Sequence, residues 1–199
     1  MRYRSICSTH MVREVMDSFN MNQIIAVESM GLGSLLELKD FDINEELMSW
    51  LVENFDPKDS SLNVHGVKLT VYLKDVEFVL GLRNEGIDLI DNKLVMDMSM
   101  EKELNIEIVG GHVGLANICR SLLSLESWEK EFMVKFMLYM IGKFLNPTTY
   151  GVHRSLIHVL GNMEDLRKVN WAKYVIDGLI KGVELKVAVH RSDVGGYVV

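Results

Sequence analysis

Apolar residues that recur at helical spacing limit what this chain can fold into more than any other feature of its sequence. The clearest example is DINEELMSWLVENFDP. One face of the helix predicted there carries the apolar side chains Ile43, Leu47, Trp50 and Leu51. Asp42 is a suitable N-cap, and Glu45 occupies the capping-box position. The pair Asp56-Pro57 predicts the end of the helix, because a residue before proline is pushed out of helical conformation.

Similar patterns, each bounded by helix start or stop signals, predict most of the other elements. The helices are expected at residues 12–19, 22–30, 73–80, 115–125, 128–145 and 152–160, with a helical turn at SLLEL. Gly31 and Gly81 are predicted to end their helices, Gly81 in the left-handed conformation that glycine tolerates. A last helix is expected from Trp171, with Asn170 as its N-cap.

Alternation of apolar and polar residues around His65-Gly66 predicts a small β-hairpin near residues 62–71. Residues 87–109 are predicted to be loop with at most a short strand or helix. We therefore expect a mainly α fold, a single compact helical domain with this hairpin. Its expected parts are an N-terminal extension or helix (1–20), the helical domain (21–185) and a frayed tail (186–199) that contains two glycines and no periodicity.

Charge and composition argue against two classes of partner. The 199 residues contain 21 Lys plus Arg against 28 Asp plus Glu, and the net charge of -7 repels phosphate backbones. We expect no direct nucleic-acid binding. No uncharged run reaches the roughly 18 apolar residues of a membrane span, so no membrane partner is expected. Two cysteines, Cys7 and Cys119, suit a reducing intracellular compartment.

Two glycine-rich stretches were considered as ligand loops. Gly31-x-Gly33 follows an apolar run, as in dinucleotide-binding loops, but Leu36 replaces the third glycine. We favour a helix end there; the nucleotide-binding alternative predicts that Gly33 lies at a strand-to-helix turn. The stretch VGGHVGL, residues 109–115, offers backbone N–H groups to an anion, yet it lacks the Walker lysine, and a flexible loop is the favoured interpretation.

The remaining reactive side chains form no recognisable catalytic or metal-binding pattern. The six histidines lack ligand spacing. Cys119 lies at a core position of its predicted helix, where cysteine behaves as a small apolar residue; the alternative is a thiolate assisted by His112. Glu45-Glu46 and the pair Glu101 and Glu103 are interpreted as solvated acids. We therefore assign no catalytic, cofactor-binding or metal-binding residue, and expect a protein that is not an enzyme and has no cofactor.

Several short blocks recur in the order seen in one known family. They are Trp50-Leu51-Val52, Phe55-Asp56, Asp75-Val76, Leu80-Gly81-Leu82, Asn146-Pro147-Thr148 and Trp171. In this respect the chain resembles the plant mobile domain, also called the aminotransferase-like plant mobile domain, from about Gln23 to Val183. It departs from the family pattern at Tyr72, Lys74 and Arg83, which replace a threonine, a glutamate and a proline.

The resemblance implies a transposon-derived or host nuclear protein that acts through protein partners, in a family linked to transposon silencing. The aminotransferase-like label implies no chemistry here, because no lysine is set apart as a Schiff-base former for pyridoxal phosphate. Two hypotheses follow. The first is a non-catalytic helical protein-interaction module, intracellular and nuclear. The alternative is a truncated N-terminal accessory region of a SUMO/ubiquitin-like cysteine peptidase polypeptide, whose catalytic residues would lie in a downstream domain.

Overall fold

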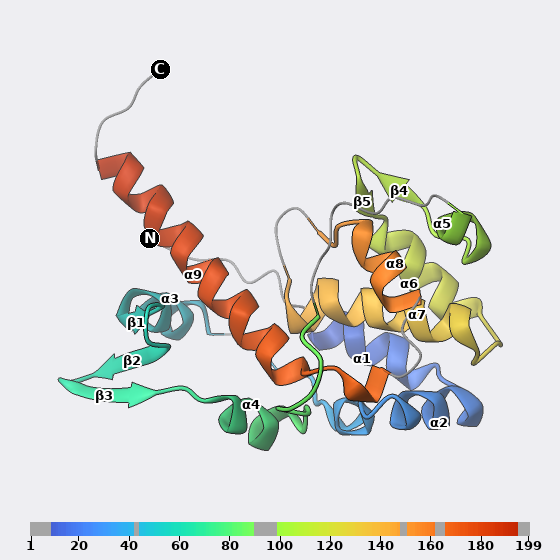
Figure 1. Cartoon of the computed structure of the whole chain (residues 1–199), viewed down its shortest axis with the longest axis horizontal. Helices are drawn as coiled ribbons and strands as arrows, with labels where there is room; N and C mark the ends of the chain where they lie inside the picture. The colour runs from blue at the N-terminus through green and yellow to red at the C-terminus, as the bar shows by residue number, and fades with distance from the viewer. Residues whose placement is uncertain (1–8, 42–43, 90–98, 148–150, 162–165, 195–199) are drawn as a thin grey trace.

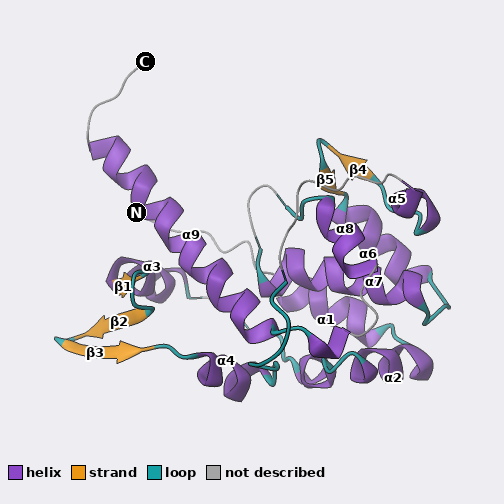
Figure 2. Cartoon of the chain, viewed as in Figure 1, coloured by secondary structure: helices purple, strands orange, loops and turns teal. Residues whose placement is uncertain are grey.

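The structure is a computed structural model that describes residues 9–41, 44–89, 99–147, 151–161 and 166–194, with side chains as far as Leu185. Helices dominate the described residues, as the sequence predicted (Figure 2). The α-helices are α1 (Thr9–Asp17), α2 (Met21–Ser29), α3 (Glu45–Asn54), α4 (Leu73–Leu80), α5 (Ser99–Glu103), α6 (Leu115–Ser124), α7 (Lys130–Met140), α8 (Ser155–Gly161) and α9 (Trp171–Val194). Two short 3₁₀-helices, η1 (Gly33–Glu37) and η3 (Leu166–Lys168), and a π-helical turn, η2 (Ile141–Leu145), complete the helical elements.

The strands form two small antiparallel sheets. The first contains β1 (Phe55–Asp56), β2 (Ser61–Val64) and β3 (Val67–Thr70) in that spatial order, and the second contains β4 (Ile108–Val109) and β5 (His112–Val113). Leu62 pairs with Leu69 across β2 and β3, so the hairpin predicted near residues 62–71 is confirmed. His65 and Gly66 form its turn, both with positive φ. The mainly α fold with a small hairpin is therefore the observed one.

Helix α7 is the centre of the hydrophobic core. It packs against α2, α6 and α8, which surround it in Figure 1. Most of its side chains are buried, because the helix is apolar on nearly all sides and such a helix is stable only inside a core. Phe19 packs edge-on against Phe132 and Phe136, with ring centroids 5.1 and 5.5 Å apart. The helix predicted over residues 128–145 is thus present as α7 and η2, and its side chains are largely buried.

Two predicted helix caps are also present. The Oδ1 atom of Asn170 accepts the Lys173 backbone N–H at 2.9 Å and starts α9. Gly81 ends α4 with φ 65 and ψ 21, the left-handed conformation, and its N–H donates to the Glu77 carbonyl at 2.7 Å. Each cap satisfies a backbone group that the helix end leaves without an intrahelical partner.

Other local predictions need correction. The predicted cap Asp42 lies outside the described residues, and Asn44 caps α3 by accepting the Leu47 N–H at 2.9 Å. The helical spacing of Leu73, Val76, Val79 and Leu80 predicts one short buried face on α4, but Val79 is exposed. Helix α8 begins three residues later than predicted, at Ser155 rather than Val152.

The end of the chain and its middle also differ from the prediction. Helix α9 continues to Val194, past the domain boundary expected at residue 185. Adding a residue to an existing helix is far more favourable than starting a new one, so the helix extends beyond that boundary. Within residues 87–109 the structure contains α5 and β4. Gly110 and Gly111, predicted to lie in a flexible loop, form the tight turn between β4 and β5, with φ of 58 and 81.

Candidate protein-interaction surface

Residues 44–80 form a segment that we call the arm: α3, the three-stranded sheet and α4. Figure 1 shows the arm to one side of the helices that surround α7. Along the chain, the fully buried hydrophobic side chains stop at Leu35 and resume at Leu82, so no described hydrophobic residue of the arm is fully buried. Yet these residues form regular helices and strands. The arm therefore has no hydrophobic core of its own, and its half-buried Val76 and Leu80 pack against the main core.

Hydrogen bonds and one helix–helix contact also hold the arm in place. Strand β2 pairs on one side with β1 and on the other with β3. The Asp75 carboxylate accepts the Tyr72 backbone N–H at 2.8 Å, which starts α4 without a side-chain cap from Tyr72. At the far end of α4, Ser34 Oγ donates to the Leu80 carbonyl at 2.7 Å. Helix α4 also packs against α9, and this contact connects the arm to the rest of the fold.

The apolar stripe of α3 faces outward. Leu47 is 55% exposed, and Trp50 and Leu51 are each 37% exposed. Their spacing of three and four residues places them on one face of the helix. Met48 and Val52, which lie on another face, are only half-buried, and α3 packs against β2. An apolar stripe ordinarily faces a core, so its exposure here marks a surface with unusual capacity to bind another apolar surface.

Two glutamates border this stripe. Glu46 precedes Trp50 by four residues and Glu53 follows it by three, so both neighbour the indole on the helix surface. Both are exposed, and neither forms an ion pair with another described residue. The whole arm, residues 44–80, contains three lysines and seven acids, a charge of 3 − 7 = −4. The exposed apolar face is thus set in an acidic surrounding.

Further apolar side chains are exposed elsewhere on the arm. They are Val67 and Leu69 on β3, Tyr72 before α4, and Phe78 and Val79 on α4. Phe78 is 90% exposed, which is exceptional for a phenylalanine. Strand β3 lies at the edge of its sheet. Single exposed apolar residues are common on proteins, but this concentration within one segment without buried hydrophobic residues is not.

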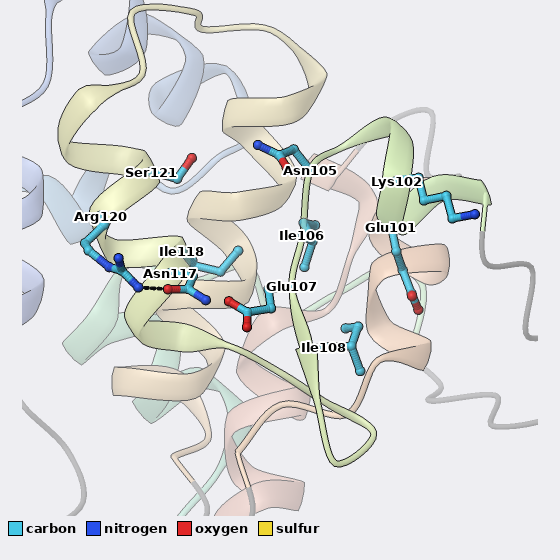
Figure 3. A pocket seen from close by; sticks show the side chains of 10 residues that line it. All are labelled: Glu101, Lys102, Asn105, Ile106, Glu107, Ile108, Asn117, Ile118, Arg120 and Ser121. Atoms are coloured by element: carbon cyan, nitrogen blue, oxygen red, sulfur yellow. Dashed lines mark hydrogen bonds between the residues drawn. The ribbon is translucent and has the colours of Figure 1, made fainter.

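A second feature is a hollow of about 870 Å³ beside α6 (Figure 3). Its lining residues are Glu101, Lys102, Asn105, Ile106, Glu107, Ile108, Asn117, Ile118, Arg120 and Ser121. Arg120 donates a hydrogen bond to Asn117 Oδ1. The buried Glu101 carboxylate accepts two hydrogen bonds from Arg154, each 2.7 Å long. The lining thus carries two acids, Glu101 and Glu107, and two bases, Lys102 and Arg120, so neither charge dominates the hollow.

Ser121, in that lining, forms an arrangement that resembles catalytic chemistry. The buried Lys135 ammonium donates to Ser121 Oγ at 2.8 Å and to Glu131 Oε1 at 2.5 Å. A serine nucleophile needs a base that accepts its proton, whereas here Lys135 donates to Ser121. We interpret Lys135 and Glu131 as a structural ion pair whose lysine also holds Ser121 through a hydrogen bond. The sequence contained a signal for it, because Glu131 and Lys135 are four residues apart, but Ser121 is distant in sequence.

The candidates raised by the sequence lie apart from both features. Gly31 follows α2 and Gly33 begins η1, so a helix end stands where the nucleotide-binding alternative required a strand-to-helix turn, and that alternative is wrong. The Cys119 thiol is half-buried near Tyr139, whose hydroxyl donates to the Met11 carbonyl at 3.2 Å. His112 instead packs edge-on against His153, with ring centroids 5.7 Å apart, and its Nδ1 donates to the Gly110 carbonyl at 3.1 Å.

Burial and the hydrogen bond with Cys119 raise the pKa of Tyr139 above its usual value. Among the residues that the structure describes, no three His, Cys, Asp or Glu side chains are grouped so that they would hold a metal ion. In the same part of the chain, no helix is long and apolar enough to cross a membrane.

Comparison with known proteins gives one match. A family model described as a domain of unknown function, DUF8566, matches residues 5–199. No curated protein and no solved structure matches the chain. The description of the family names no activity.

Proposed function

We propose that this chain, which belongs to the DUF8566 family, is a non-catalytic helical module that binds other proteins through its arm. One observation carries the proposal: the arm is regularly folded, yet eight of its large apolar side chains are exposed and none is fully buried. On soluble proteins, a large patch of exposed apolar side chains commonly marks a site that binds a partner. The helices around α7 then serve as a rigid base for the arm.

The apolar face of α3 has the composition of an interface centre. Trp is among the residues that contribute most to protein–protein binding, and here Trp50 lies between Leu47 and Leu51 on one face. Burying a fully exposed leucine stabilises by about 1.5–3 kcal/mol, so a half-exposed one contributes about 1 kcal/mol. Three such side chains together contribute about 3 kcal/mol. Association itself costs at least about 4 kcal/mol, so a stable complex also needs contacts with the other exposed apolar side chains of the arm.

The resemblance to the plant mobile domain supports the same kind of function. It suggests protein partners in the nucleus and a link to transposon-derived genes or to transposon silencing. Several blocks that carry the resemblance fall on the arm: Trp50-Leu51-Val52, Phe55-Asp56 and Asp75-Val76. We propose the nuclear setting on this basis.

Arm-dependent capture tests the proposal. The tagged chain and the variant Leu47→Ser/Trp50→Ser/Leu51→Ser would be used to capture proteins from plant nuclear extract. The control variant is Leu123→Ser, which changes a leucine of similar exposure, 45%, on α6. We expect a reproducible set of proteins with the wild type and the control that is lost with the triple variant. Identical sets from all three proteins would refute the arm as the binding surface.

The non-catalytic part of the proposal has its own test. Purified protein would be incubated with peptide, nucleotide and amino-acid substrates. We expect no turnover. Turnover that disappears when a single polar residue, such as Ser121 in the hollow beside α6, is replaced by alanine would show an enzyme instead.

A further inference from the structure

We infer that the partner bound by α3 is a basic amphipathic helix, whose apolar face packs on Leu47, Trp50 and Leu51 and whose Lys or Arg side chains lie opposite Glu46 and Glu53. This inference rests on the proposed function and names the chemistry of the partner. Three observations carry it: the shape of the apolar stripe, the unpaired acids beside it, and the unfavourable charge of the obvious competitor, a second copy.

The stripe fits a helix. Leu47, Trp50 and Leu51 occupy one face of a ten-residue helix, which is about 15 Å long. A side-chain ridge of this kind packs into the groove of another helix at an interaxial distance of about 8–10 Å. Helix-in-groove recognition uses anchors at the same spacing of three and four residues. The partner needs about three turns to cover the stripe.

The acids give the charge of the partner. Glu46 and Glu53 lie directly beside Trp50, are exposed, and make no ion pair with the described residues. A partner that covers Trp50 brings its own flanking residues within a few ångströms of both carboxylates. Desolvating unpaired carboxylates is unfavourable, so a partner with cations at those positions is favoured and one with acids is rejected. The arm as a whole, with a charge of −4, also attracts a basic chain before contact.

A second copy of this chain fits less well. In an antiparallel pair of α3 helices centred on Trp50, Glu46 of each copy would lie opposite Glu53 of the other. Like charges placed opposite each other across an interface are destabilising. The whole chain, at -7, repels its copies as well. Self-association is therefore an outcome that the experiment must be able to detect.

The test uses three fluorescent 18-residue peptides and the full chain. The first has leucines at helical spacing flanked by lysines. The second has the same leucines flanked by glutamates. The third has the composition of the first in an order that destroys the apolar face. By fluorescence anisotropy at 150 mM salt, we expect the first peptide to bind at least about tenfold more tightly than either of the others.

Variants locate the binding to α3. Leu47→Ser/Leu51→Ser is expected to weaken binding of the lysine-flanked peptide at least about tenfold. Glu46→Lys/Glu53→Lys is expected to reverse the preference, so that the glutamate-flanked peptide binds more tightly. The matched control is Leu123→Ser/Glu126→Lys, which changes an exposed leucine and an exposed acid elsewhere and should leave binding unchanged. Circular dichroism and thermal unfolding of each variant verify that it is folded.

Each contrary result has a distinct meaning. Equal binding of the ordered and scrambled lysine peptides overturns the inference, because charge alone would then explain binding. So does binding that neither α3 variant changes. If sedimentation shows a dimer that Leu47→Ser/Leu51→Ser dissociates, a second copy occupies the face and the inference is wrong. If capture from nuclear extract depends on the arm but the three peptides bind with equal affinity, the proposed function stands. Only the inference that the partner is a basic amphipathic helix is then wrong.

Discussion

Replacing Gly81 with alanine tests how the arm is joined to the core. Gly81 has φ 65, and alanine in this left-handed conformation costs about 1 kcal/mol. A Cβ added there would also lie 2.5 Å from Ser34 Oγ and close to Ser34 Cβ, far inside contact distance. Relief of that clash requires Ser34 to move, which breaks its 2.7 Å hydrogen bond to the Leu80 carbonyl. The lost bond contributes about 1 kcal/mol, so the expected destabilisation is about 2 kcal/mol.

Urea unfolding followed by circular dichroism at 222 nm measures this loss. Gly110→Ala is the matched control, because Gly110 has φ 58 and nothing lies within 4 Å of an added Cβ there. We expect that control to lose only the backbone contribution, about 1 kcal/mol. In the double variant Gly81→Ala/Ser34→Gly the clash is absent, and the coupling energy should be about 1 kcal/mol. Equal losses for Gly81→Ala and Gly110→Ala would refute the steric part of this reasoning.

Three further predictions concern polar contacts. Glu101→Gln should destabilise by about 2–3 kcal/mol in urea unfolding, because it leaves the partly buried Arg154 guanidinium without its carboxylate; a loss under about 0.5 kcal/mol would contradict this. Lys68→Met should raise the pKa of Asp59 towards 3.8 in a carboxyl NMR titration, because the Lys68 hydrogen bond lowers that pKa. Since the pKa of Asp59 is lower in the folded than in the unfolded state, its contribution to the stability of the fold is present at neutral pH and is lost on acidification. Burial raises the pKa of Tyr139, so in an absorbance titration Tyr139 should ionise at higher pH than exposed tyrosines. Its contribution to the stability of the fold should decrease above about pH 10, where tyrosines of the unfolded chain ionise. Simultaneous ionisation of all tyrosines would refute the burial of Tyr139.

The sequence predicts the helix that carries the candidate surface, but not that its apolar face is exposed. The pattern Leu47, Trp50, Leu51 predicts an amphipathic helix, and α3 is one. A period of 3.6 residues shows that the apolar side chains share a face, but not what that face contacts. In α7 the apolar residues contact the core, and in α3 they face outward. The same local signal therefore had two outcomes.

Contacts distant in sequence were out of reach of local patterns. Ser121 and Lys135 lie on α6 and α7 and meet only because those helices pack together. Glu101 and Arg154 are 53 residues apart, and Glu101 had been interpreted as a solvated acid. The tight turn at Gly110-Gly111 was missed because the flanking strands, β4 and β5, have only two residues each. So short an alternation cannot be distinguished from loop.

What the sequence determined by itself was the set of local elements and several of their ends. Helix periodicity, the Asn170 cap and the left-handed Gly81 depend on interactions within a few residues, which a linear pattern contains. The tertiary structure alone decided which apolar faces are buried. Burial depends on the packing of segments far apart in the chain, here around α7, and that packing leaves the apolar face of α3 exposed to solvent.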